Sequence, residues 1–186
     1  MADDYDISVL EHLHRNRIVY LAGEITTDTA SSIVQRLFVL DAIDPDAEIR
    51  LYVSSYGGSV YAGLAVYDAM QLVRAPISTF ALGPAFSMAA WLVAAGELGR
   101  RFAAPNARFM LHQASSGLSG TTSDLRVAAD NVLAMERRMT EILAAHTGLP
   151  EGDVRRAIER DLWLSPDDAK TLGLIDRISE PAERKH

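Results

Sequence analysis

The chain contains no cysteine among its 186 residues, and this absence excludes several kinds of chemistry. Without a thiol the protein forms no disulfide, no cysteine nucleophile and no thiolate-bound metal centre. Long apolar runs are also missing, since the longest, Met88 to Gly96, is too short to span a membrane. The lack of disulfides and of a signal-like leading segment predicts a cytoplasmic protein with no membrane partner. We expect no metal or other cofactor.

Lysine is almost absent, with only Lys170 and Lys185 against sixteen arginines. A serine–lysine peptidase needs a lysine close to its nucleophile, and both lysines are remote in sequence from every glycine and serine motif. The composition therefore disfavours a Ser–Lys dyad. The formal net charge of −7 also argues against nucleic acid as a partner.

The length fits a single domain spanning residues 1–186, with enough chain to bury a substantial core. Apolar runs and helical periodicity alternate along the sequence, which predicts an α/β fold with a catalytic site at strand ends. The expected strands cover residues 17–22, 49–53, 77–82 and 107–113; the expected helices cover 27–41, 60–73, 88–95 and 123–145.

Ser87 is the most informative residue, because it stands between the strand-like run 77–82 and the apolar helix 88–95. The free N–H groups at a helix start stabilise developing negative charge, so a serine there suits nucleophilic catalysis. Serine is also a frequent helix N-cap, and taken alone Ser87 favours that simpler interpretation.

Two further residues complete the set that a serine nucleophile requires. His112 ends the strand-like run 107–113, and Asp161 follows a charged helix end. A serine hydroxyl needs a base that takes its proton, and the base needs a carboxylate that fixes its tautomer. The order Ser87, His112, Asp161 differs from the orders found in trypsin, subtilisin and the α/β-hydrolases, which disfavours those three families.

These residues make the chain resemble the ClpP family, the proteolytic subunit of the Clp protease. Twenty-five positions separate Ser87 from His112, and forty-nine separate His112 from Asp161, as in that family. The resemblance extends from about Arg17 to about Ile178. It is carried by the local motifs Ser55-Tyr56-Gly57-Gly58, Gly83-Pro84-Ala85-Phe86-Ser87-Met88, Leu111-His112-Gln113, His146-Thr147-Gly148 and Glu159-Arg160-Asp161.

The resemblance implies a role for each matching position. Ser87 would be the nucleophile, His112 the general base and acid, and Asp161 the residue that orients His112. The backbone N–H groups of Gly58 and Met88 would form the oxyanion hole. The implied activity is that of a serine endopeptidase cleaving unfolded proteins and short peptides.

The resemblance also implies an architecture, a ClpP/crotonase-like spiral of β-β-α units with a protruding handle helix over residues 123–145. Two heptameric rings would stack through that helix into a tetradecamer that encloses a chamber. Glu159 and Arg160 would make the ring–ring contact, and Tyr52 would help to dock a Clp ATPase. From the pattern alone, an ordinary amphipathic core helix and a solvated charged pair remain open alternatives.

The chain departs from the family pattern at a few places. Tyr56 replaces a proline, Phe86 replaces an alanine beside the nucleophile, and Ala114 replaces a proline after the histidine. Only Met1 to Asp6 precede the first apolar run, so we expect little of an axial loop. A second hypothesis is therefore a poorly active structural or regulatory subunit in a ring mixed with a paralogous ClpP. A third, a crotonase-type acyl-CoA enzyme, does not use a Ser–His–Asp set.

Overall fold

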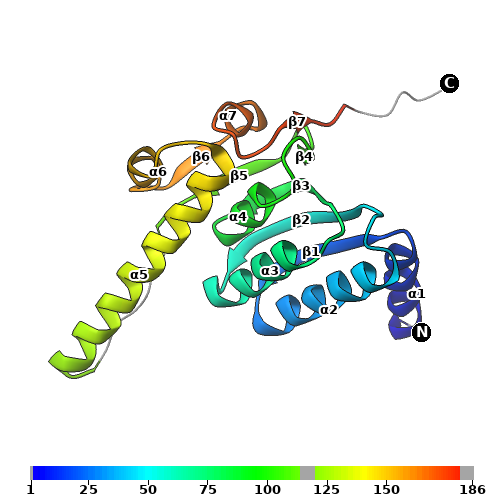
Figure 1. Ribbon diagram of the computed structural model, residues 1–186, viewed down its shortest axis with the longest axis horizontal. Coiled ribbons are helices and arrows are strands. Elements are labelled where there is room, and N and C mark those ends of the chain that lie inside the picture. The colour runs from blue at the N-terminus through cyan, green and yellow to red at the C-terminus, as the bar shows by residue number, and fades with distance from the viewer. Residues whose placement is uncertain (1, 114–119, 181–186) are drawn as a thin grey trace.

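The computed structural model describes residues 2–113 and 120–180, and in these ranges it contains a mostly parallel sheet with helices packed around it (Figure 1). The strands are β1 (Ile18–Ile25), β2 (Ile49–Gly58), β3 (Ile77–Phe86), β4 (Arg101–Ala103), β5 (Arg108–Leu111), β6 (Leu162–Leu164) and β7 (Arg177–Ile178). The helices are α1 (Ala2–Arg15), α2 (Thr27–Ile43), α3 (Val60–Leu72), α4 (Met88–Ala94), α5 (Thr122–Thr147), α6 (Glu151–Ala157) and α7 (Pro166–Thr171). The predicted α/β class is confirmed.

Strand β3 divides the sheet into two parts, because its two halves pair with different neighbours. The main order is β1-β2-β3-β4-β7, with every pair parallel. The first half of β3 pairs with β4 around Thr79–Ala81, and its last three residues, Pro84–Phe86, pair with β5. Strand β6 then runs antiparallel to β5. The carboxyl end of β3 therefore leads into Ser87 with β5 and β6 alongside.

Three predicted strand ends are wrong, since β1, β2 and β3 continue past Ala22, Val53 and Leu82 to Ile25, Gly58 and Phe86. Glycines that look like turn residues in the sequence lie within the paired strands. Irregularities in register after Ala22 and after Val53 absorb the extra residues, and pairing resumes beyond each one. The consequence is that Gly57 and Gly58 lie in a strand, not in a turn.

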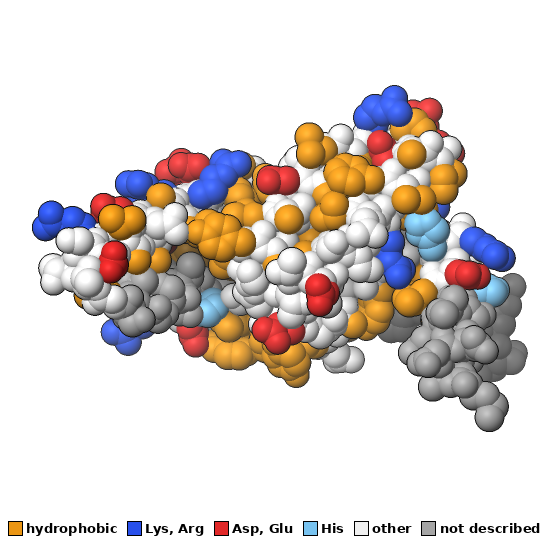
Figure 2. All heavy atoms as spheres, turned by 90° about the horizontal axis from the view of Figure 1, so that it is seen from below, with side chains coloured by type: hydrophobic (Ala, Val, Ile, Leu, Met, Phe, Trp, Pro, Cys, Tyr) orange, Lys and Arg blue, Asp and Glu red, His pale blue; other side chains and the backbone are white. Residues whose placement is uncertain are grey.

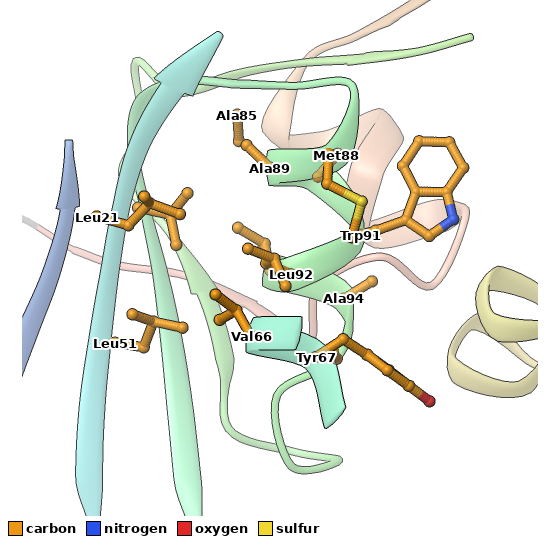
Figure 3. Close-up of a cluster of buried hydrophobic side chains, with 14 of the residues drawn as sticks. Leu21, Leu51, Val66, Tyr67, Ala85, Met88, Ala89, Trp91, Leu92 and Ala94 are labelled. Carbon is orange, nitrogen blue, oxygen red and sulfur yellow. The ribbon is translucent and has the colours of Figure 1, made fainter. Parts of the chain in front are cut away.

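The core lies between the sheet and helices α3 and α4 (Figure 3). Leu21 and Leu51 point from β1 and β2 toward Val66 of α3 and Leu92 of α4, and all four side chains are at most 1 % exposed. Every residue of α4 is buried, which explains why this seven-residue helix is apolar on all sides. The segment that follows Ser87 is thus embedded in the interior.

Helix α5 extends well beyond the body of the protein (Figure 1), and its bounds differ from the predicted 123–145 by one or two residues. A capping box between Thr121 and Asp124 begins the helix, and Gly148, with a φ of 76°, ends it. Only its carboxyl-terminal half is buried, through Met139, Thr140, Ile142 and Leu143. Figure 2 shows hydrophobic side chains among charged ones on the protruding end, and Val127 is 71 % exposed.

Arg101 fastens the carboxyl-terminal part of the chain to the sheet from a nearly buried position on β4. Its guanidinium donates to the carbonyls of His146 and Gly173 and to both carboxylate oxygens of Asp176. Burial alone would raise the pKa of Asp176, but the hydrogen bonds and charge of Arg101 outweigh burial and hold that pKa below its usual value. One arginine therefore joins β4, the end of α5 and the segment before β7.

Candidate active site

The backbone of Ser87 has a conformation that is rare for a residue with a side chain, with φ 51° and ψ −133°. Such a conformation typically costs about 1–3 kcal/mol and persists only where the surroundings enforce it. Here the Ser87 N–H donates to the carbonyl of Met110 at 2.7 Å, which ties the turn to β5. The strained turn presents the hydroxyl at the end of β3, immediately before the buried helix α4.

The Ser87 hydroxyl makes no capping bond to α4, although Ser87 occupies the N-cap position. Its Oγ lies 2.8 Å from Nε2 of His112. The interpretation of Ser87 as a side-chain helix cap, which the isolated motif favoured, is therefore wrong. The hydroxyl is within hydrogen-bonding distance of a base, as an activated nucleophile requires.

His112 reaches Ser87 because of strand pairing. It follows β5 directly, and β5 pairs with β3 so that Met110 is opposite Phe86, the residue before Ser87. The imidazole side chain is 30 % exposed, which leaves it accessible from outside the core. The sequence run predicted as 107–113 is shorter as a strand, but its end still delivers His112 to the serine.

Asp161 approaches the same imidazole from the other side, but more loosely. Its Oδ1 lies 3.9 Å from Nδ1 of His112, beyond hydrogen-bonding distance, and its side chain is 62 % exposed. The predicted charged helix end is shorter than expected, because α6 stops at Ala157 and leaves Asp161 in the irregular segment before β6. The three residues therefore meet in the predicted order, with one close contact and one loose one.

Two glycines at the end of β2 have no room for side chains, Gly57 because of the serine turn and Gly58 because of β1. A Cβ on Gly57 would come within 2.8 Å of both the Ser87 Cβ and the Phe86 carbonyl, and its φ is 93°. A Cβ on Gly58 would come within 2.4 Å of the Ile25 carbonyl, at a φ of 149°. Glycine is thus required at both positions: at Gly57 so that the main chain of β2 can approach Ser87, and at Gly58 so that it can approach the end of β1. Met88 supplies the N–H that follows the serine at the start of α4.

A narrow, largely apolar pocket opens beside Ser87 and His112. Its free volume of about 20 Å³ accommodates roughly one water molecule. The indole N–H of Trp91 donates to the Met139 carbonyl and fixes one wall. The other walls contain flexible methionines, which adapt readily to a guest. Its lining comprises Val60, Ser87, Met88, Trp91, His112, Gln113, Glu136, Met139 and Ile158.

The remaining predicted residues lie apart from the Ser87–His112 pair. Glu159 and Arg160 are exposed in the segment between α6 and Asp161. Tyr52 is half-buried on β2, and its ring stacks on Phe80 with centroids 4.7 Å apart; Phe80 stacks on Phe102 at the same separation. Residues 114–119, which include the Ala114 that replaces a family proline, lie outside the described residues.

His146, the first residue of one of the family motifs, is half-buried in the last turn of α5. Its Nε2 lies 3.2 Å from the hydroxyl of Tyr67. Burial and the nearby charge of Arg101 lower the pKa of His146, and burial raises the pKa of Tyr67. His146 thus belongs to the packing between α3 and α5.

The sequence interpretation missed Trp163, which joins two aromatic residues near the serine. The Phe86 ring meets the edge of Trp163 at 5.1 Å and that of Tyr56 at 5.4 Å between centroids. A signal was present, because Trp163 is only two positions beyond Asp161.

Across residues 2–113 and 120–180, no cluster of acidic or histidine side chains could hold a metal ion, and no helix is long and apolar enough to cross a bilayer.

Here a serine hydroxyl at the end of a parallel strand lies within hydrogen-bonding distance of a histidine ring. This is the arrangement found in serine hydrolases. Comparison with known proteins is more specific, since the family model described as Clp protease matches residues 2–182. The chain is also 42 % identical over 174 residues to the ATP-dependent Clp protease proteolytic subunit of Deinococcus radiodurans, an alignment covering 94 % of this chain and 84 % of that protein. The chain belongs to the Clp protease family, a family of serine endopeptidases, and the predicted resemblance is confirmed.

Proposed function

We propose that this protein is a serine endopeptidase subunit in which Ser87 attacks the scissile peptide bond and His112 acts as its general base and acid. The observation that carries the proposal is the 2.8 Å separation between Ser87 Oγ and His112 Nε2. Family membership supports the same chemistry independently. The strained backbone of Ser87 is a second support, because strain of this kind is concentrated at functional sites.

The reaction proceeds by two acyl transfers. Ser87 Oγ forms a bond to the carbonyl carbon while its proton passes to His112 Nε2, which gives a tetrahedral oxyanion. The backbone N–H groups of Gly58 and Met88 are our candidates for oxyanion donors, each worth about 3–4 kcal/mol in sites of this type. His112 then protonates the leaving amine as the C–N bond breaks. Water repeats the sequence on the acyl-enzyme and releases Ser87.

Asp161 is the proposed orienting carboxylate, and its loose contact defines what must change for full activity. A shift of about 1 Å would bring its oxygen from 3.9 Å into hydrogen-bonding distance of His112 Nδ1. Glu159 and Arg160 are sequence neighbours of Asp161. If they make the ring–ring contact, as the family resemblance implies, assembly would order the segment that carries the carboxylate.

The proposed assembly is the family's pair of stacked heptameric rings, enclosing a chamber in the cytoplasm. The protruding half of α5, with its exposed Val127 and Leu133, suits a helix that packs against another subunit. The half-buried, stacked ring of Tyr52 is compatible with docking of a Clp ATPase beside this residue of β2. The substrates would be unfolded polypeptides and short peptides.

The exposure of Asp161 also favours a second candidate function, a poorly active regulatory subunit of a mixed ring. In that case Ser87 and His112 would have only a structural role, and the Asp161 carboxylate would never form a hydrogen bond with His112. The two candidates differ in whether Ser87 is reactive, because only an activated serine reacts rapidly with a fluorophosphonate.

The test is covalent labelling of the purified protein by a fluorophosphonate, read by intact mass, with Ser87→Ala as the control. We expect one adduct per chain in the parent protein and none in Ser87→Ala. Ser87→Ala removes only the hydroxyl oxygen, so the variant should keep the fold. An unlabelled parent in well-assembled rings would contradict the peptidase proposal and favour the regulatory subunit.

A further inference from the structure

Three aromatic side chains form a continuous surface on one side of Ser87, which we call the aromatic shelf: Tyr56, Phe86 and Trp163. Phe86 is central, and both neighbours meet its ring edge-to-face, at interplanar angles of 80° and 81°. Edge-to-face contacts at 5.1–5.4 Å are favourable for aromatic rings and hold them in fixed relative positions. The shelf is therefore a defined surface rather than three independent side chains.

Each member of the shelf is tied to a different part of the candidate site. Phe86 directly precedes Ser87, Tyr56 is two residues before Gly58, and Trp163 is two residues after Asp161. Strand pairing aligns two of them, because Met110 of β5 is opposite Phe86 of β3 and also opposite Trp163 of β6. Three separate strands, β2, β3 and β6, thus contribute one aromatic ring each, and the central ring belongs to the residue before Ser87.

Core packing does not explain the shelf, because its outer members face solvent. Tyr56 is 72 % exposed and Trp163 is 59 % exposed. Contiguous exposed aromatic surface generally marks a binding site, and rings of this size supply much of the contact area in such sites. The position beside the nucleophile points to the substrate as the molecule that covers it.

The chemistry of the site fixes which part of the substrate would lie there. The shelf is separate from the narrow pocket, because none of its three rings is among the residues that line that pocket. Trp163 lies on β6, which pairs with β5, and His112 directly follows β5. Since His112 must hand its proton to the departing amine, the leaving segment emerges on the His112 side.

We propose that the aromatic shelf is a subsite for the leaving-group half of the substrate, with preference for an aromatic or large apolar residue directly after the scissile bond. The inference rests on the proposed peptidase function and adds a specificity determinant to it. Tyr56, Phe86 and Trp163 are binding residues here and take no part in proton transfer.

The test is partition of the acyl-enzyme between two amine nucleophiles supplied together, phenylalaninamide and alaninamide. In each transfer the amine nitrogen bonds to the acyl carbon, the bond to Ser87 Oγ breaks, and the amine proton returns through His112 to the serine. Both products arise from one acyl-enzyme made from a short peptide ester, so differences in acylation rate cancel from their ratio. We expect phenylalaninamide to be favoured at least about tenfold, the equivalent of 1.4 kcal/mol.

Trp163→Ala and Tyr56→Ala should each reduce that preference to about threefold or less, and Trp163→Phe should retain most of it. Phe38→Ala is the matched control, because Phe38 is another exposed aromatic, 44 % exposed on α2 and outside the site. Its partition ratio should equal that of the parent.

The outcomes separate the two proposals. An acyl-enzyme with equal preference for both amines, or a ratio that neither shelf variant alters, would overturn the shelf inference and leave the peptidase intact. A parent protein that forms no acyl-enzyme and resists the fluorophosphonate would overturn the proposed function, and the inference with it.

Discussion

The two contacts of His112 differ in how firmly the fold holds them. On one side, Ser87 lies between the paired strand β3 and the fully buried helix α4, and its Oγ lies 2.8 Å from Nε2 of His112. On the other side, Asp161 lies in an exposed segment beyond α6, 3.9 Å from Nδ1. The contrast teaches that a single subunit already brings Ser87 and His112 into contact, whereas the contact with the proposed carboxylate is not made at hydrogen-bonding distance.

The largest effect should come from breaking the preformed contact. His112→Ala should lower the rate of peptide hydrolysis by at least about 10⁴-fold, because Ser87 loses the base that takes its proton. The rate should be measured with a fluorogenic peptide in assembled rings, and matched thermal unfolding should exclude misfolding. A His112→Ala protein with more than a tenth of parental activity would mean that another group activates Ser87.

Arg101 differs from His112, because its hydrogen bonds stabilise the fold and take no part in the proposed reaction. Arg101→Met should lower the free energy of unfolding by about 3–5 kcal/mol, since it leaves Asp176 partly buried without its cation. Urea unfolding is the measurement. The neighbouring Arg100→Met is the control, because its partners Glu48 and Glu97 are exposed and such pairs are worth about 0–1 kcal/mol. Equal losses from both variants would contradict the proposed anchor.

The smallest effect should be a pH dependence of stability from His146. Its pKa is lowered in the folded protein, so between that value and about 6.5 the unfolded chain binds more protons than the folded one. Stability should therefore fall as the pH drops below about 6.5. His146→Gln should flatten this part of the curve while keeping the carbonyl that accepts from Arg101. Parallel urea midpoints for both proteins from neutral to mildly acidic pH would contradict the assignment.

The sequence predicted the elements better than their ends. The strand beginning at Ile49 is visible as an alternation that places Ile49, Leu51 and Val53 on its buried face, and the buried helix after Ser87 is visible as an unbroken apolar segment. The end of β2 at Gly57 and Gly58 could not be predicted. From the sequence alone, a glycine in a turn cannot be distinguished from a glycine in a strand that allows a close backbone contact. Only the irregular pairing with β1 shows which applies.

For the candidate site, the sequence likewise predicted which residues come together but not the distances between them. The spacing of Ser87, His112 and Asp161 indicated which residues meet, since it reflects family membership. The distance from His112 to Asp161 depends on where α6 ends and how exposed the following segment is, which are tertiary properties. Trp163 escaped notice because its contact with Phe86 runs across β5 and β6, between positions far apart in the chain.

The central claim is that the Ser87–His112 contact is preformed and the Asp161 contact is not. The most direct test is the rate constant for phosphonylation of Ser87 by a fluorophosphonate in unassembled subunits of the parent, His112→Ala and Asp161→Asn proteins. We predict that His112→Ala slows phosphonylation by at least about 10³-fold, while Asp161→Asn slows it by less than about tenfold. Equal losses in the two variants would show that Asp161 is already engaged in the single subunit, and would contradict the account.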